Sequence, residues 1–220
     1  MNAVNEQFRR ENLAKRGFTL VEMMVVILIA ATAALLLRPA LAGNKTRAPR
    51  INCVNNLKQI GIAFRTWDLD HGGNYPMRVS MTNGGTMEAA SEVFRTFRVM
   101  SNELSTPKIL VCPAEKRRPF ATNFLSDLSN ANLSYFVGID ATKELPQMFL
   151  AGDRNITNAT GLKGGILGLT TNEPAAWTHE LHEKQGNIGL ADGSVQQFSS
   201  NRLREGMKFS GDPLNRLAMP

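Results

Sequence analysis

Residues 17–37 read GFTLVEMMVVILIAATAALLL, an apolar run in which Glu22 is the one ionisable side chain. A helix of about 20 residues, rising 1.5 Å per residue, covers the roughly 30 Å hydrocarbon core of a bilayer. Residues 18–38 are therefore predicted to form a membrane-spanning helix. Basic residues precede it, which predicts a cytoplasmic amino end and an exported segment over residues 39–220. These basic residues are Arg9, Arg10, Lys15 and Arg16.

Glu22 is the unusual residue of this predicted helix. A carboxylate inside a spanning helix costs roughly 3 kcal/mol or more unless it is paired, so Glu22 is a candidate functional residue. A positive group on a neighbouring copy of the chain is its natural partner. Two other interpretations stay open: a plain single-span anchor that tolerates Glu22 near the interface, and a secretory signal peptide cleaved after Ala40-Leu41-Ala42.

The junction Gly17-Phe18-Thr19-Leu20-Val21-Glu22, behind a basic leader, resembles the amino terminus of type IV prepilins and type II secretion pseudopilins. The resemblance implies that residues 1–17 are a leader and that a membrane-bound prepilin peptidase cuts between Gly17 and Phe18. The same enzyme would methylate the new amino group of Phe18. It also implies that Glu22 pairs with the ammonium group of Phe18 on an adjacent subunit during assembly. Pro39 stands where many such subunits carry a helix-perturbing proline.

The exported part begins with a second helical pattern. Apolar residues recur at spacings of three and four, which predicts an amphipathic helix that ends before His71. Pro49 is expected to bend or loosen the chain before this helix. In the family that the chain resembles, such a helix packs on an antiparallel sheet, so the expected fold is α+β and pilin-like. The apolar positions are Ile51, Val54, Leu57, Ile60, Phe64 and Trp67.

Shorter elements are expected further along the chain. Residues 88–101 favour a short helix, and a carboxy-terminal hairpin is predicted around a two-residue type I′ turn at Asp192-Gly193. The last 20 residues are expected to be an irregular or surface segment. Strands are predicted over residues 109–112, 133–139, 147–150, 187–191 and 194–198.

The chain has two cysteines, Cys53 and Cys112. Export favours a disulfide between them, which the chain-entropy model values at roughly 4 kcal/mol; two buried free cysteines are the alternative. Neither cysteine has a second one nearby, which excludes a CxxC zinc or redox pair.

The segment from His182 to Asp192-Gly193 resembles the His-x9-Asp-Gly carboxy-terminal signature of a large prepilin-like group. We expect a structural role, with Asp192 suited to the turn and His182 hydrogen-bonded to a carboxylate or carbonyl. His179 and His182 are three residues apart, whereas a zincin helix needs histidines four apart, so no catalytic metal is expected. Asp153 and Asp192 are a candidate calcium pair, although no EF-hand-like alternation supports them.

Composition narrows the function classes. The 220 residues carry a net charge of +6, but the basic patches at 115–118 and at Arg95 and Arg98 are more typical of a solvated face than of a nucleic-acid site. No nucleophile elbow, P-loop or dinucleotide fingerprint is present, so neither an enzyme nor a cofactor is expected.

The predicted function is a structural subunit of a type II secretion or type IV pilus filament, anchored in the inner membrane by a single span with its head periplasmic or in the filament. The resemblance implies four partners: the prepilin peptidase, other subunits, an inner-membrane assembly platform and the lipid bilayer. The alternative is a membrane-tethered periplasmic enzyme or ligand-binding domain with a site near His182 and Asp192.

Overall fold

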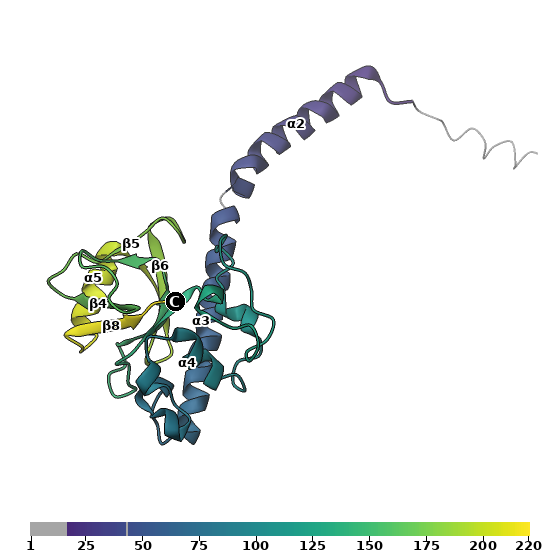
Figure 1. The fold of residues 1–220 in the computed structure, drawn as a ribbon. Coiled ribbons are helices and arrows are strands. Elements are labelled where there is room, and N and C mark those ends of the chain that lie inside the picture. Colours follow the sequence, from purple (N-terminus) through teal and green to yellow (C-terminus); the bar gives the residue numbers. More distant parts are fainter. Residues whose placement is uncertain (1–16, 43) are drawn as a thin grey trace, which may run out of the picture. The chain divides into compact units, whose positions relative to one another are not determined.

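The computed structural model describes residues 17–42 and 44–220 (Figure 1). The chain divides into two compact units at residues 45 and 46, and each is described here by itself. Residues 1–16 of the expected leader lie outside the described residues, as does Gly43 between the first two helices.

The first unit contains helix α2, Leu20–Ala42. Its side chains are exposed throughout the part in which they are described, from Leu20 to Leu35, although nearly all of them are apolar. The helix begins two residues after the predicted start at residue 18 and continues past residue 38. In the part of the chain that the structure describes, no helix combines the length and the apolar character that a bilayer crossing requires.

The second unit, the head, is built on helix α3, Asn44–Asp70. Leu57 and Phe64 of the predicted apolar stripe are fully buried, and the helix ends before His71 as expected. Ile51, by contrast, is half exposed. Pro49 lies inside the helix and does not interrupt it, because the missing amide costs one hydrogen bond within the first two turns and the helix continues. The bend or loosened turn expected over residues 42–49 stays a prediction, since Gly43 lies outside the described residues.

A six-stranded antiparallel sheet packs against α3. Its strand order is β4-β8-β1-β2-β6-β7, so the last strand in the sequence, β8, lies inside the sheet between β4 and β1. The expected α+β fold, with an amino-terminal helix on an antiparallel sheet, is confirmed. The strands are β1 Tyr135–Gly138, β2 Phe149–Asp153, β4 Ile166–Thr170, β6 Gln185–Leu190, β7 Val195–Ser199 and β8 Leu214–Ala218.

The sheet buries a core on each face, because successive side chains of a strand point to opposite sides. Tyr135 and Val137 of β1 join the α3 side, whereas Phe136 between them joins the other side. Helix α5, Ser200–Phe209, and a two-stranded sheet of β3, Ile156–Thr157, and β5, Ala176–Trp177, cover that second side (Figure 1). The head is therefore a three-layer structure.

The connection between α3 and the sheet is mostly irregular. The helix expected over 88–101 is shorter, α4 Val93–Val99. The strand expected over 109–112 is wrong: Pro107 opens a 3-10 helix, Pro107–Leu110, in which the Thr106 hydroxyl accepts from the amide of Lys108. The other 3-10 helices are Pro76–Arg78, Met81–Asn83, Met87–Ala89 and Asn130–Asn132.

Two corrections concern the carboxy-terminal region. Strands β6 and β7 form the predicted hairpin, but the amide of Leu190 also donates to the carbonyl of Ser194, so three residues, 191–193, close the loop rather than two. Gly193 donates to the carbonyl of Leu190 and has a φ of 83°, whereas Ala191 and Asp192 do not have positive φ, as a type I′ turn would require. The last 20 residues are not irregular either, because they contain most of α5 and all of β8.

Candidate functional site: the amino-terminal motif and the disulfide corner

The predicted cleavage junction is open. Gly17, Phe18 and Thr19 precede α2 without helical structure, and Phe18 is 73% exposed. Among the described residues beyond its chain neighbours, no atom lies within 4 Å of the position that a Cβ would occupy on Gly17. The described side of the Gly17–Phe18 peptide bond is therefore non-helical and exposed, which suits cleavage by a protease.

Glu22 closes a capping box at the start of α2. Its carboxylate Oε2 accepts hydrogen bonds from both the amide and the hydroxyl of Thr19, each at 3.1 Å, and its own amide donates to the Thr19 hydroxyl at 3.2 Å. The reciprocal pattern satisfies donors that the first helical turn leaves open. It holds the carboxylate one turn from Phe18.

Four buried side chains meet in the head at what we call the disulfide corner: Cys53, Cys112, Asp153 and His182. Cys53 of α3 and Cys112 form the disulfide, with Cα atoms 5.3 Å apart, and no cysteine is free. The Nε2 atom of His182 lies 3.3 Å from the Cys112 sulfur and 3.4 Å from Oδ2 of Asp153. His182 thus lies beside a carboxylate, and the expected hydrogen bond to a carboxylate or carbonyl stays a prediction.

Burial shifts the charge states of the corner. It raises the pKa of Asp153 to about 7, against two hydrogen bonds from Asn187 that act in the opposite direction. It also lowers the pKa of His182 to about 4, with a further contribution from the charge of Arg50. Both shifts have one cause: desolvation penalises the charged form of each group.

The corner is held by amide hydrogen bonds. Asn187 of β6 donates its backbone amide and its side-chain amide to Oδ2 of Asp153, at 2.7 and 2.8 Å. Asn155 donates to the carbonyls of Thr178, Leu181 and Gln185 and so closes the loop that carries His182.

That loop adopts an unusual backbone. His182, Glu183 and Lys184 have φ values of 51°, 52° and 61°, three consecutive non-glycine residues in the left-handed region. Each such residue costs of order 1 kcal/mol or more and persists only where the surroundings fix it. The bonds from Asn155 and the burial of His182 supply that constraint.

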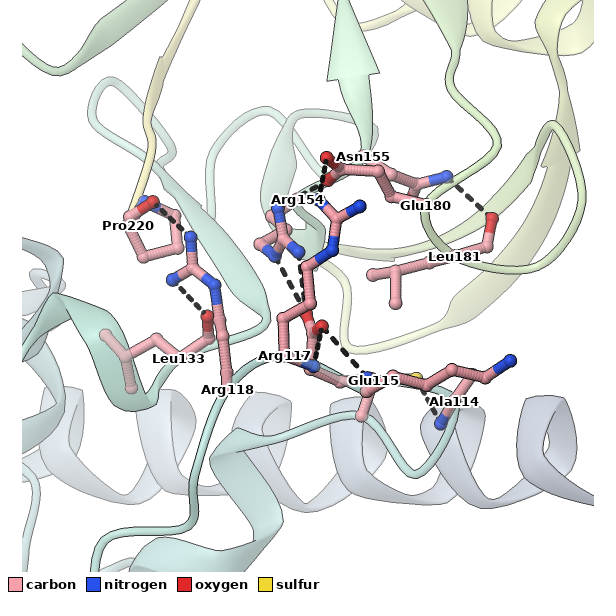
Figure 2. Close-up of polar contacts among 12 residues, drawn as sticks. Ala114, Glu115, Arg117, Arg118, Leu133, Arg154, Asn155, Glu180, Leu181 and Pro220 are labelled. Carbon is pink, nitrogen blue, oxygen red and sulfur yellow. Dashed lines mark hydrogen bonds and ion pairs between the residues drawn. The ribbon is translucent and has the colours of Figure 1, made fainter.

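An ion-pair network ties the corner's segments together on its outer side (Figure 2). Arg154, next to Asp153, donates to Oε2 of Glu115 at 2.7 and 3.0 Å and to Glu180 at 2.7 Å. It thereby joins β2 to the segment after Cys112 and to the loop before His182. Burial raises the pKa of Glu115, but hydrogen bonds from the Arg117 amide and from Arg154 outweigh it, so the pKa is lowered overall.

The arginines predicted to form solvated basic patches are used inside the head. Arg118 donates to the carbonyls of Leu133 and Pro220 (Figure 2) and to that of Asn130. Arg98 donates to two further carbonyls, and Arg95 pairs with Glu92. The solvated-face interpretation is therefore wrong for Arg98 and Arg118, which are partly buried and bonded.

The signature residues hold the two ends of one strand to α3. His182 lies at the disulfide, while at the other end of β6 the carbonyl of Asp192 accepts from Arg65 of α3. Strand β6, with five residue steps, and the helix from Cys53 to Arg65, with twelve, both span roughly 17–18 Å, so the two ends of β6 can lie beside these two positions of α3. His182 and Asp192 therefore occupy opposite ends of a strand and do not share a site.

Asp192 has a local role, because its carboxylate accepts from the amide of Ser194 in the turn at 2.8 Å. It does not belong to the group that contains Asp153, whose neighbours are sulfur and imidazole rather than the oxygen ligands that calcium prefers. Calcium binding by Asp153 and Asp192 stays a prediction. The sequence did not single out Asn155, Asn187 or the Arg154 network, and no motif marks them.

Comparisons with known proteins agree with the amino-terminal motif. The family model described as the prokaryotic N-terminal methylation motif matches residues 12–37. This confirms the prepilin-type character of the amino terminus that its residues suggested.

Part of the chain is also similar in sequence to three proteins that share one name. Over 62 residues the chain is 42% identical to the type II secretion system core protein G of Pectobacterium carotovorum subsp. carotovorum and 44% identical to that of Klebsiella pneumoniae. The protein of the same name from Klebsiella michiganensis is 41% identical over 63 residues. These matches cover 28–29% of this chain and 39–44% of the relatives, so the chain spans less than half of their length. No solved structure matches the chain.

Proposed function

We propose that this protein is a pilin-like structural subunit that a prepilin peptidase cleaves between Gly17 and Phe18 and that then assembles into a filament through α2. The observation that carries the proposal is the junction itself: the exposed Phe18 leads directly into a helix whose described side chains are exposed and nearly all apolar. The methylation-motif match over residues 12–37 supports it.

The proposed location of α2 follows from its surface. A helix that is apolar on every side is stable where lipid or other apolar helices cover it. We place α2 in the inner membrane before assembly and in the filament core afterwards, with the leader cytoplasmic and the head periplasmic. Extraction by an inner-membrane assembly platform would keep the apolar surface covered in both places.

Glu22 would change partners during assembly. In the single chain its carboxylate accepts two neutral hydrogen bonds from Thr19. The ammonium group of Phe18 on a neighbouring subunit would offer a charge-assisted hydrogen bond, which is roughly twice as strong as a neutral one. The capping box keeps the carboxylate at the end of the helix, where that ammonium group can approach.

Between the two filament types we propose the secretion pseudopilin, because the relatives are named as type II secretion system core proteins. An enzyme or ligand-binding head with a shared His182–Asp192 site receives no support from the geometry, since the two residues lie at opposite ends of β6. We therefore propose an assembly role rather than catalysis.

Mass spectrometry of the protein isolated from its own membranes tests the cleavage. We expect a mature chain that begins with a methylated Phe18. An amino terminus at Gly43 would indicate signal-peptidase cleavage after Ala42 and would overturn the proposal.

A second experiment tests assembly. Glu22→Ala should abolish incorporation into filaments, measured by crosslinking between a wild-type and a tagged copy, while the head stays folded. Glu205→Ala, which removes an exposed carboxylate of the head, is the matched control and should leave incorporation unchanged. Equal crosslinking by both variants would contradict the role of Glu22.

A further inference from the structure

The disulfide corner has the composition of a metal site. Cys53, Cys112, Asp153 and His182 each present one ligand atom, and these atoms all lie within 4.8 Å of one another. They come from four separate segments: α3, the segment after the 3-10 helix at 107–110, strand β2 and the loop before β6. Two sulfurs, one imidazole and one carboxylate are ligand types that zinc takes in proteins.

The distances fit a tetrahedral ion. Zinc bonds of about 2.3 Å to sulfur and 2.0–2.2 Å to nitrogen and oxygen place the ligand atoms of a tetrahedron roughly 3.3–3.8 Å apart. Nε2 of His182 already lies 3.3 Å from the Cys112 sulfur, and it lies 3.4 Å from Oδ2 of Asp153, the oxygen that Asn187 holds. The sulfurs, which are bonded in the oxidised chain, must separate, and the other ligand atoms, all within 4.8 Å of one another, would adjust around the ion.

A separate observation points to a missing ligand. Oδ1 of Asp153 is buried and has no hydrogen-bond partner among the described residues, whereas Oδ2 accepts two bonds from Asn187. A buried carboxylate oxygen without a partner is costly in a completed structure. A cation at the corner would satisfy this oxygen while Asn187 keeps the carboxylate oriented.

The charges of the corner also balance. Two thiolates and one carboxylate around a divalent ion carry a net charge of −1. Arg50 lies close enough to Asp153 and His182 to interact with both electrostatically. Its guanidinium group would bring the buried total to zero, which a site of such low exposure requires.

We infer that the dithiol form of this chain, before its disulfide is made, binds one zinc-class divalent ion through Cys53, Cys112, Asp153 and His182. A newly made chain carries both thiols, so no redox step is needed; each thiol gives its proton to solvent as its sulfur binds the ion. The ion would hold the two sulfurs, which are 59 residues apart in the sequence, side by side in the dithiol chain.

Cobalt(II) reports the geometry and ligands of such a site. The full chain in detergent is unfolded in guanidinium with a phosphine, which reduces the disulfide and becomes the phosphine oxide, and is then refolded with cobalt or with zinc. We expect one equivalent of metal per chain, thiolate-to-cobalt charge-transfer absorption and the intense d–d bands of a tetrahedral ion. The oxidised chain should bind none.

Variants distinguish zinc binding at the disulfide corner from adventitious zinc binding elsewhere on the chain. Asp153→Asn and His182→Asn should each weaken zinc binding by at least about tenfold, since ligand loss costs no less than the loss of an outer hydrogen bond. Asparagine tolerates the left-handed backbone at position 182. His179→Asn, at an exposed position three residues away, is the control and should bind as the wild type does.

Measurements on the wild-type chain test the inference even if a variant fails to fold. If the reduced wild type unfolds, zinc should restore its folded state as judged by circular dichroism. Octahedral cobalt spectra, equal binding by the oxidised chain, or a reduced chain that neither binds nor refolds with metal would each overturn the inference.

Discussion

Helices α2 and α3 follow each other in the sequence, yet they differ in what covers their apolar surface. On α3 the apolar side chains form a stripe, and the head's own sheet and loops bury it: Leu57 is 1% exposed. On α2 apolar side chains occupy every side, and Ile27 is 62% exposed. The stability of α3 is thus a property of the folded chain, whereas α2 depends on what surrounds the protein. Substitutions on α3 should therefore change the free energy of unfolding of the head, whereas substitutions on α2 should not.

The largest effect should come from removing the covalent link between α3 and the rest of the head. Cys53→Ala with Cys112→Ala opens a loop of 59 residues, and the chain-entropy model gives a loss of about 4 kcal/mol in the free energy of unfolding. Tryptophan fluorescence in denaturant measures this, because both tryptophans, Trp67 and Trp177, lie in the head. A loss below about 1 kcal/mol would show that packing alone holds α3.

Leu57→Ala should cost about 3 kcal/mol, since it removes a fully buried side chain from the α3 core and leaves a cavity. The same denaturant titration measures it. Ile62→Ala on the exposed side of α3 is the matched control, and a similar loss from both variants would contradict the orientation of the helix.

Glu115→Gln should cost about 2 kcal/mol near neutral pH, because it replaces charge-assisted hydrogen bonds to Arg154. The pKa of Glu115 is lowered in the folded state, so its stabilisation is present above its unfolded value of 4.5 and is lost as the pH falls through the folded value. Free energies of unfolding measured between pH 7 and pH 3 should therefore fall less steeply for Glu115→Gln than for the wild type. Parallel slopes would contradict the lowered pKa.

Gly193→Ala should cost roughly 1–2 kcal/mol. Alanine is strained at a φ of 83°, and its Cβ would lie 2.9 Å from the guanidinium carbon of Arg65, which holds the hairpin to α3. Gly161→Ala is the control: its φ is 70°, but the new Cβ would meet nothing within 4 Å. The difference in their unfolding free energies measures the hairpin contact, and no difference would mean that this contact adds nothing.

The smallest effect should be that of Ile27→Ala on α2. Because Ile27 belongs to the first unit and to neither hydrophobic core of the head, the free energy of unfolding of the head should stay within about 0.5 kcal/mol of the wild type. Thermal unfolding in detergent, followed by tryptophan fluorescence, checks it. A clear loss of head stability would contradict the claim that α3, but not α2, contributes to the stability of the head.

The sequence predicted the parts of this fold that repeat a local pattern. The apolar periodicity of residues 51–67 predicts α3, and the turn residues Asp192-Gly193 predict the β6–β7 hairpin. Strand β8 does not, because Leu214 is exposed and Asn215 is buried, the reverse of what polarity predicts. Asn215 is accommodated by a hydrogen bond from its side chain to the carbonyl of Asp212, a contact that no pattern encodes.

The candidate site divides in the same way. The amino-terminal motif is contiguous, so Gly17, Phe18 and Glu22 could be identified from six residues. The disulfide was expected and His182 was singled out, but their meeting was not, since 70 residues separate Cys112 from His182. Only the tertiary fold brings Asp153 and Asn187 to the same place.

The position of β8 decides when the head can form. Strands β1 and β4 do not pair with each other; each pairs with β8, which follows every other strand along the chain. A nascent head that has not yet delivered residues 214–218 therefore has an unfilled slot in the middle of its sheet. Without residues 214–218, neither β4 nor this edge of β1 has its partner strand, so the six-stranded sheet cannot be completed before they are present.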